Sequence, residues 1–278
     1  MKIDSAYITA EKFAREHYEN FPVVSVFIKK ELRKHVAIVY WFARTADDIA
    51  DEGNLPDDQK LTRLNDFEHR LESLLKGDYK NEFEAALNNT ITACSLTPQL
   101  FFDLIAAFRQ DLVQKRYKSF REILDYCNLS ANPVGRLILE LNGVKDEKAF
   151  YYSDRICTAL QLINFYQDVK VDYSRGRIYF STDEMEKYCV TENMFELNQN
   201  NLNLQELVKY NVNRAEQMLD EGKNLLKFLS GRLRYEIKWT LLGGSEILKR
   251  INKNKFNIFI RPKLRKSDFL RLMFKSIV

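Results

Sequence analysis

Hydrophobic positions recur with a helical period along most of the chain. The spacing is clearest at 101–112 and 215–229, where apolar residues fall at every third or fourth position and so predict amphipathic helices. The pattern is interrupted near 53–56, 96–98, 131–133, 143, 174–176 and 230–231. Pro98 and Pro133 suit the first turn of a helix, so roughly ten helices joined by short loops are expected.

The composition supports a helical protein and argues against several classes of partner and site. Only 9 glycines and 5 prolines occur in 278 residues, too few for the many turns of an all-β fold. We find no linker or repeat, so one domain over 1–278 is predicted. The net charge of +4 does not call for nucleic acid as a partner. Four dispersed cysteines argue against a zinc site or a disulfide framework.

The basic residues are concentrated at the C-terminus. Residues 251–278 contain eight Lys or Arg and a single acid, Asp268. Such a segment can contact an anionic membrane surface or an anionic substrate, and it can equally be a solvated terminal helix. The N-terminus lacks the apolar core of a signal peptide, and no apolar run is long enough to span a bilayer. We therefore expect a cytoplasmic protein, with peripheral contact to the inner face of the membrane left open.

The first informative segment is 36–52, which begins as an apolar stretch typical of a buried helix. Tyr40, Arg44, Asp47 and Asp51 fall on one face of it, and Asp48 flanks them. Like charges one turn apart cost a helix roughly 0.2–0.5 kcal/mol, and more when they are partly buried. A cation is therefore expected at this stripe.

The second informative segment is 160–172, which is again mainly apolar. Gln161, Asn164, Asp168 and Asp172 fall at i, i+3, i+7 and i+11, so one continuous helix would carry them on a single face. Arg177 follows shortly afterwards. This stripe also ends in two aspartates one turn apart.

Two such aspartate pairs indicate a divalent metal with oxygen ligands. Mg²⁺ takes one or two protein carboxylates together with phosphate oxygens of a substrate. Arg44 and Arg177 could donate charge-assisted hydrogen bonds to the same diphosphate. A single pair is common at ordinary acidic helix ends, whereas two pairs with aligned polar residues favour function. A di-iron site would need Glu-x-x-His motifs, and neither these nor a glycine-rich phosphate loop occurs.

At these residues the chain resembles the squalene/phytoene synthase family, over nearly its whole length. The matching stretches are 44–51, 161–172 and 177–180. The resemblance implies an all-α, single-domain helical bundle whose central cavity is closed by the two motifs. It also implies two or three Mg²⁺ ions held by Asp47, Asp51, Asp168 and Asp172. The positions that it places at the diphosphate end, with Asp48 beside them, are Tyr40, Arg44, Gln161, Asn164, Arg177 and Tyr179.

One stretch departs from the condensing members of the family. These typically carry a tyrosine at a position that corresponds here to Asn128 or Leu129, and Asn132-Pro133 replaces a glycine region. This stretch and 19–22, which includes Phe21, are similar to bacterial hydroxysqualene synthases. The similarity implies conversion of presqualene diphosphate and water to hydroxysqualene and diphosphate, and we do not expect NADPH. The stretch 126–135 also has the residues of a helix break, and both interpretations are expected to hold.

Departure of the diphosphate would leave a carbocation that needs an apolar, electron-rich cavity. Aromatic faces can stabilise such a cation, and the candidates are Phe21, Tyr40, Phe42 and Phe165. A single water held near Asn128 or Asn132 would then give the alcohol.

Three alternatives remain open. One is condensation of two farnesyl diphosphates to presqualene diphosphate, squalene or dehydrosqualene, or of two geranylgeranyl diphosphates to phytoene. Another is a non-catalytic helical assembly factor of the same fold, which degraded aspartate motifs would mark, although all four aspartates are intact here. The third is a membrane-surface protein defined by its basic tail. The sequence shows no pattern that indicates the chain length of the isoprenoid substrate or the oligomeric state of the protein.

Overall fold

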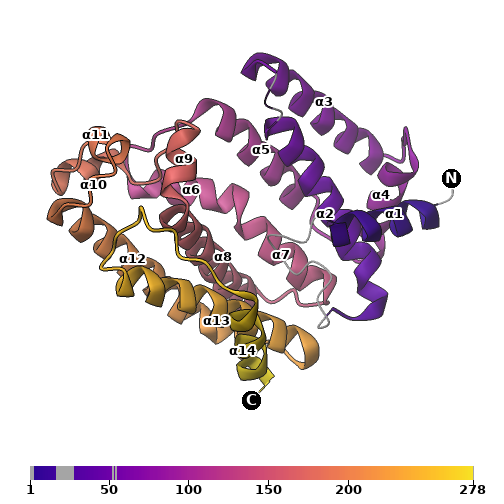
Figure 1. The fold of residues 1–278 in the computed structure, drawn as a ribbon. Coiled ribbons are helices and arrows are strands. Elements are labelled where there is room, and N and C mark those ends of the chain that lie inside the picture. Colours follow the sequence, from indigo (N-terminus) through magenta and orange to yellow (C-terminus); the bar gives the residue numbers. More distant parts are fainter. Residues whose placement is uncertain (1–2, 17–27, 52, 54, 278) are drawn as a thin grey trace. The chain divides into compact units, whose positions relative to one another are not determined.

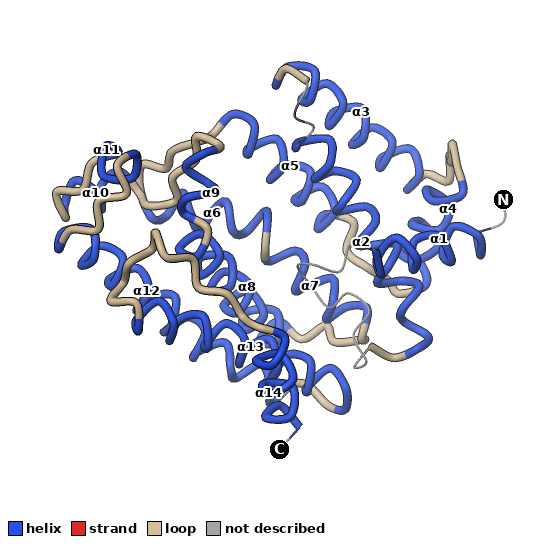
Figure 2. Tube along the Cα trace, viewed as in Figure 1, coloured by secondary structure: helices blue, strands red, loops and turns tan. Residues whose placement is uncertain are grey.

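The computed structural model describes residues 3–16, 28–51, 53 and 55–277, and it is helical throughout (Figures 1 and 2). No strand occurs within these ranges, which confirms the predicted all-α class. The α-helices are α1 (Ile3–Glu16), α2 (Lys30–Asp51), α3 (Asp57–Leu75), α4 (Glu82–Ala93), α5 (Gln99–Val113), α6 (Phe120–Ser130), α7 (Asn132–Leu141), α8 (Glu147–Gln167), α9 (Val169–Ser174), α10 (Thr182–Lys187), α11 (Glu192–Glu196), α12 (Leu202–Gly222), α13 (Gly231–Lys253) and α14 (Lys266–Ile277).

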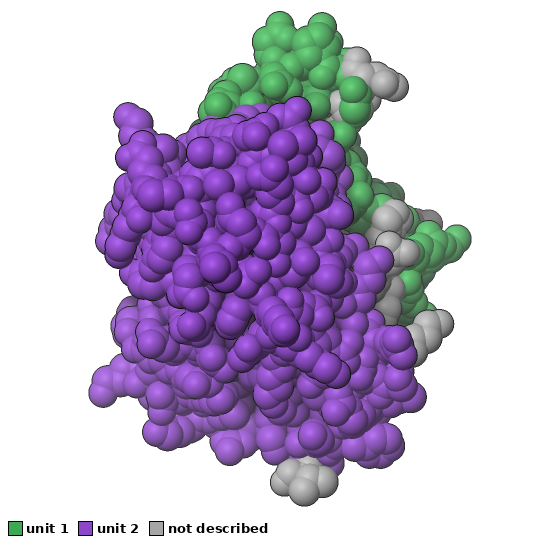
Figure 3. Space-filling model, turned by 60° about the vertical axis from the view of Figure 1, so that its left-hand side comes forward, with its two compact units in different colours: residues 1–113, 133–146 green, residues 114–132, 147–278 purple. Residues whose placement is uncertain are grey.

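The helices form two compact units, coloured separately in Figure 3. Unit 1 comprises residues 1–113 and 133–146, and unit 2 comprises residues 114–132 and 147–278. Each unit is built from two segments that are not contiguous in sequence, because the chain crosses between the units three times. The description of 1–278 as one domain stays a prediction.

The core of unit 1 surrounds α2. Phe42 is 1% exposed, stacks on Phe67 at 4.9 Å and meets Phe101 edge-on at 5.2 Å between ring centroids. Burial of such rings is among the largest apolar contributions that a side chain makes. The buried carboxylate of Glu140 on α7 accepts hydrogen bonds from the backbone N–H and the hydroxyl of Thr97, just before α5. A carboxylate at this end of α5 also offsets the helix dipole.

In unit 2, α8 packs along α12. Gly222 at the end of α12 permits their close approach: a Cβ there would lie 3.2 Å from the backbone nitrogen of Ile156 and 3.3 Å from the carbonyl oxygen of Tyr152. Gly244 on α13 has a similar role, since a Cβ there would lie 2.8 Å from Leu160. Small residues at these positions bring α8 within van der Waals reach of both neighbours.

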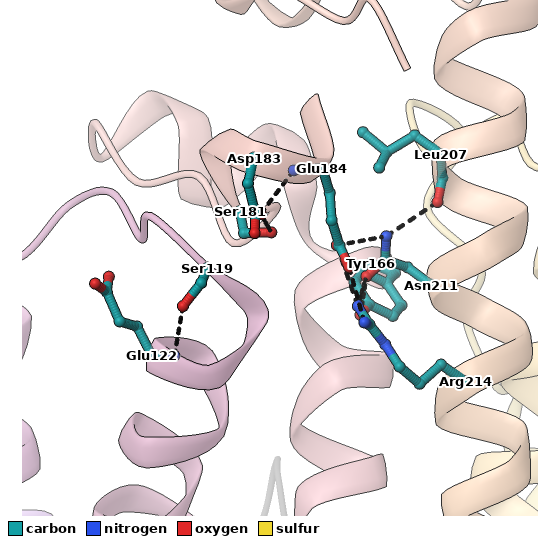
Figure 4. Close-up of polar contacts among 9 residues, drawn as sticks. All are labelled: Ser119, Glu122, Tyr166, Ser181, Asp183, Glu184, Leu207, Asn211 and Arg214. Atoms are coloured by element: carbon teal, nitrogen blue, oxygen red, sulfur yellow. Dashed lines mark hydrogen bonds and ion pairs between the residues drawn. The ribbon is translucent and has the colours of Figure 1, made fainter. Parts of the chain in front are cut away.

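A buried polar network fixes the last turn of α8 (Figure 4). The Tyr166 hydroxyl donates to Asn211 Oδ1 at 3.1 Å, and Asn211 Nδ2 donates to Glu184 at 3.2 Å. Arg214 donates to both Glu184 oxygens, at 2.8 and 3.1 Å. Burial raises the pKa of Tyr166, so its hydroxyl stays a donor. The network ties α8 to α10 and α12 two residues before Asp168.

The predicted breaks coincide with helix ends, but two details differ. The helix expected over 215–229 is α12 up to Gly222, followed by a 3₁₀ turn at Lys223–Lys227. The expected number of helices is too small, because α9, α10 and α11 have only five or six residues. Helices this short hardly complete a hydrophobic period, so the apolar pattern does not reveal them. Within the described ranges, no helix has the length and apolarity needed to cross a membrane.

Candidate functional site

The first acidic stripe lies on α2, as the sequence predicts. Tyr40, Arg44, Asp47 and Asp51 occupy one side of this helix, whose other side buries Ala46 and Ala50 in the core. The Arg44 guanidinium pairs with Asp47 at 3.1 Å and with Asp48 at 2.8 Å, and all three side chains are at least one third exposed. The cation expected from the charge pattern is therefore Arg44 itself.

One arginine does not balance the negative charge of this stripe. Burial and the neighbouring Asp51 raise the pKa of Asp47 to about 6, although Arg44 acts in the opposite direction. Asp48 and Asp111 add to the raised pKa of Asp47. A carboxylate in such surroundings is stabilised in its charged form by a further cation. Carboxylate oxygens at this spacing are also suitable ligands for Mg²⁺.

The second acidic stripe is not on one continuous helix, and that prediction is wrong. Helix α8 ends at Gln167 and α9 begins at Val169, with Asp168 between them at φ −108° and ψ 16°. Asp168 N–H still donates to the Asn164 carbonyl, and Asp172 N–H donates to the Asp168 carbonyl, both at 2.9 Å. The backbone therefore bends at Asp168 while keeping Asp172 one turn away. This backbone region is sparsely populated and frequent at active sites.

A cation from far along the chain holds Asp168. Arg261 binds both carboxylate oxygens, with Nη2 at 2.9 Å from Oδ2 and Nε on Oδ1. Beside this pair, Gln167 Nε2 donates to the Pro262 carbonyl at 2.6 Å. Asn164 Nδ2 lies 3.4 Å from Asp168 Oδ2. The sequence analysis missed Arg261, for which the basic excess at 251–278 was the available signal.

Asp172, Arg177 and Tyr179 line a small cavity of about 10 Å³ in unit 2. A cavity of this size is near the limit for one water molecule. The Arg177 backbone N–H donates to the Asp172 carbonyl at 2.8 Å, which folds the loop back onto α9. Gly176 makes this turn possible, because its φ of +75° is costly for other residues. The structure thus brings together one residue that the resemblance assigns to the metal and two that it places at the diphosphate end.

Aromatic rings cluster behind this cavity. Phe165 and Tyr179 stack face to face with centroids 3.6 Å apart, and Tyr126 lies about 6.1 Å from each. Tyr117 completes the cluster, 5.8 Å from Tyr179. The sequence analysis assigned no role to Tyr117 or Tyr126, because their contacts join α6, α8 and two loops. Among the candidate rings, Phe42 is enclosed by the core of unit 1, and Phe21 lies outside the described residues.

Asn128 and Asn132 lie on α6 and at the first residue of α7. Asn132 is buried, donates to Asn128 Oδ1 at 2.8 Å and accepts from the Thr158 hydroxyl at 3.0 Å. Asn128 is exposed, as is Asn164, while Gln161 is partly buried on α8. The Asn132 amide thus links α6 to α8, which is the structural role that a helix break predicts.

The donor set suits a hard divalent cation. No group of three or more His, Cys, Asp or Glu side chains capable of holding a metal ion occurs in the part of the chain that the structure describes. Pairs of carboxylates, in contrast, are what Mg²⁺ requires when phosphate oxygens and water complete its shell. Both aspartate pairs supply donors of the type that this ion prefers.

Comparison with known proteins decides the family. The model of the family described as squalene/phytoene synthase matches residues 14–268. The chain belongs to this family. Among relatives in the squalene/phytoene synthase family, hydroxysqualene synthase of Sinorhizobium fredii is 31% identical over 86% of this chain and 81% of its own length. Hydroxysqualene synthase of Zymomonas mobilis is 36% identical over 68% of this chain and 63% of its own length.

Solved structures agree with the squalene/phytoene synthase assignment. Squalene synthase HpnC from Alicyclobacillus acidocaldarius is 33% identical, with a TM-score of 0.87 over 92% of this chain and 96% of that one. A dehydrosqualene synthase in complex with a ligand has a TM-score of 0.88 over 99% of this chain and 96% of that one. At 21% identity this second likeness concerns the fold. The central cavity that the resemblance implies stays a prediction.

Proposed function

We propose that this enzyme converts presqualene diphosphate and water to hydroxysqualene and diphosphate, with Mg²⁺ as cofactor. The observation that carries the proposal is the pair of intact acidic stripes, each with an arginine in contact with an aspartate. The relatives named hydroxysqualene synthase support the choice of reaction. Cytoplasmic location and independence from NADPH belong to the same proposal.

In this proposal Asp47 and Asp51 of unit 1 and Asp168 and Asp172 of unit 2 hold two or three Mg²⁺ ions. When bound, the metal supplies Lewis-acid and electrostatic stabilisation of the departing diphosphate. Asp48 anchors one side of the Arg44 guanidinium, as the contact of 2.8 Å indicates. Arg44 then presents its remaining N–H groups to diphosphate oxygens, which is a charge-assisted interaction.

The remaining candidates orient the substrate or shape its surroundings. Arg177 supplies positive charge beside Asp172, at the cavity that both line. Tyr40, Gln161 and Asn164 offer polar groups on the two stripes, and the stacked Phe165 and Tyr179 provide aromatic faces for the carbocation. Asn128 is the better candidate for holding the attacking water, because the Asn132 amide is already hydrogen-bonded on both of its ends.

Condensation is the second candidate function. The 15-cis-phytoene synthase of Synechocystis is 26% identical over 93% of this chain and 80% of its own length, and the acidic stripes would serve either reaction. What favours hydration is the stretch at 126–135, where Asn128 and Leu129 stand in place of a tyrosine.

A product assay separates the two reactions. The purified protein and Mg²⁺ are incubated separately with presqualene diphosphate and with farnesyl diphosphate, without NADPH, and extracts are analysed by mass spectrometry. The proposal expects hydroxysqualene from the first substrate and no product from the second. Presqualene diphosphate or a C30 hydrocarbon from farnesyl diphosphate would show a condensing synthase. An Asp47→Asn control, which should be inactive with both substrates, checks that product formation needs the acidic stripe.

A further inference from the structure

The C-terminal helix α14 has an apolar face that the rest of unit 2 does not cover. Its inner side packs on α13 through Leu272, which is 3% exposed, and through the fully buried Ser276. Three large apolar side chains are exposed on the opposite side: Leu270 (57% exposed), Phe274 (65%) and Ile277 (51%). Phe269 lies at the edge of the α13 contact and is 46% exposed. In a helix of 12 residues this is a dense concentration, whereas exposed apolar residues are normally scattered singly.

Aromatic residues of α13 extend this face. Trp239 meets Phe269 edge-on, with ring centroids 6.2 Å apart. Tyr235 lies one turn earlier on the same helix and is 38% exposed. Trp and Tyr carry an apolar ring and a polar group, the combination that is enriched where proteins meet the membrane–water interface. We call Tyr235, Trp239, Phe269, Leu270, Phe274 and Ile277 the α14 patch.

Positive charge surrounds the α14 patch. Asp268, the only acid of residues 251–278, pairs with Arg250 at 2.9 Å and Arg271 at 3.2 Å, and the same two arginines also pair with Glu246 of α13. Lys263, Arg265 and Lys275 are exposed, and they make no ion pair within the described part of the chain. An apolar helix face bordered by such cations is complementary to an anionic lipid surface, because the apolar side chains enter the acyl boundary while the cations stay among the headgroups.

We propose that the α14 patch docks this enzyme on anionic phospholipid bilayers, with α14 lying flat in the interface. No residue of the α14 patch belongs to either acidic stripe, so the inference goes beyond the proposed reaction. A second copy of the chain is a poorer occupant, since two such patches would bring their surrounding cations together. The apolar contact and the electrostatic attraction each contribute, and each is removed separately in the test.

The experiment is vesicle flotation of the full chain with phosphatidylcholine vesicles, with or without phosphatidylglycerol. The variant Leu270→Ser/Phe274→Ser removes apolar contact at unchanged charge, and Arg265→Ser/Lys275→Ser removes charge at unchanged apolar surface. The matched control is Leu197→Ser/Leu202→Ser, which alters equally exposed apolar residues elsewhere in unit 2. Circular dichroism verifies that each variant is folded.

The proposal expects the wild-type chain to float with vesicles that contain phosphatidylglycerol, and less in high salt. The apolar variant should bind about tenfold more weakly or worse, the charge variant should lose its dependence on phosphatidylglycerol, and the control should match wild type. Failure of the wild-type chain to float would overturn the proposal, as would equal binding by the apolar variant and the control. A dimer in sedimentation that only the apolar variant dissociates, without vesicle binding, would make a second copy the occupant. Turnover of detergent-dispersed presqualene diphosphate, measured in parallel, tests the proposed reaction independently of docking.

Discussion

The two acidic stripes both end in two aspartates one turn apart but obtain their balancing cation differently. On α2, Arg44 contacts Asp47 and Asp48 from the same helix, three and four residues away. In unit 2, Arg261 contacts Asp168 across 93 residues of chain. The first contact is available as soon as α2 forms, whereas the second needs the segment after α13 to return to the end of α8.

The difference extends to backbone and burial. The α2 stripe lies on an uninterrupted helix, and its paired side chains are 36–52% exposed. Asp168 lies at a bend between two helices, and its side chain is only 15% exposed. Local ion pairs on exposed helices contribute little to stability, while bidentate pairs that are partly desolvated contribute more. In unit 1 the aspartates are therefore paired with an arginine of the same helix, whereas in unit 2 the pairing depends on a tertiary contact.

The largest expected effect is on turnover, where the two stripes should behave alike. Asp47→Asn and Asp168→Asn should each lower the proposed Mg²⁺-dependent turnover of presqualene diphosphate by roughly two orders of magnitude or more, because each removes a charged oxygen from a proposed metal ligand. The measurement is kcat at saturating Mg²⁺, with Asp125→Asn, in an exposed pair with Arg121 on α6, as control. Full activity in either stripe variant would remove that stripe from the metal site.

The second effect concerns the packing that places α8. Gly222→Ala should destabilise the protein by about 1–3 kcal/mol, because the added methyl meets the α8 backbone and Ile156. Gly243→Ala is the matched control on α13, where the nearest atom lies 3.9 Å away and alanine favours the helix. Urea unfolding measures both. If Gly222→Ala were as stable as Gly243→Ala, close α8–α12 contact would not be what positions the second stripe.

The third effect is the stability lost when the long-range pair of Arg261 and Asp168 is removed. Arg261→Gln should destabilise the protein by about 1 kcal/mol, a value reduced by the partial exposure of Arg261. It should also speed amide hydrogen exchange in residues 254–265, since the contact to Asp168 is lost. Exchange measured by mass spectrometry with peptide resolution tests this, and unchanged protection of 254–265 would contradict it.

The smallest effect on stability is expected at the local pair. Arg44→Gln should change the free energy of unfolding by less than about 0.5 kcal/mol, because its partners are half-exposed neighbours on one helix. Turnover should fall nonetheless if Arg44 contacts the diphosphate. If Arg44→Gln lost as much stability as Arg261→Gln, the proposed difference between a local and a long-range ion pair would be contradicted.

The sequence predicted the elements better than the contacts between them. Apolar spacing located α2, α5 and the last turns of α12, and Pro133 and Gly143 fall near the ends of α7. It failed at Asp168, since the apolar period continues across the bend and backbone hydrogen bonds span it. The role of Asn132 was equally hidden, because its partner Thr158 comes from α8.

What the sequence determined by itself is the helical class, the family and the residues of the acidic stripe on α2. The helical class and the stripe follow from periodicity and from neighbours three or four residues apart, which local geometry brings together, and the family follows from the motifs at 44–51, 161–172 and 177–180. Only the tertiary structure decided the bend at Asp168, its pairing with Arg261, and which side of α14 stays uncovered. These depend on segments that meet after large loops close. The sequence shows that charged and apolar residues are present in these segments. The packing of α8, α12 and α13 determines which of them are in contact.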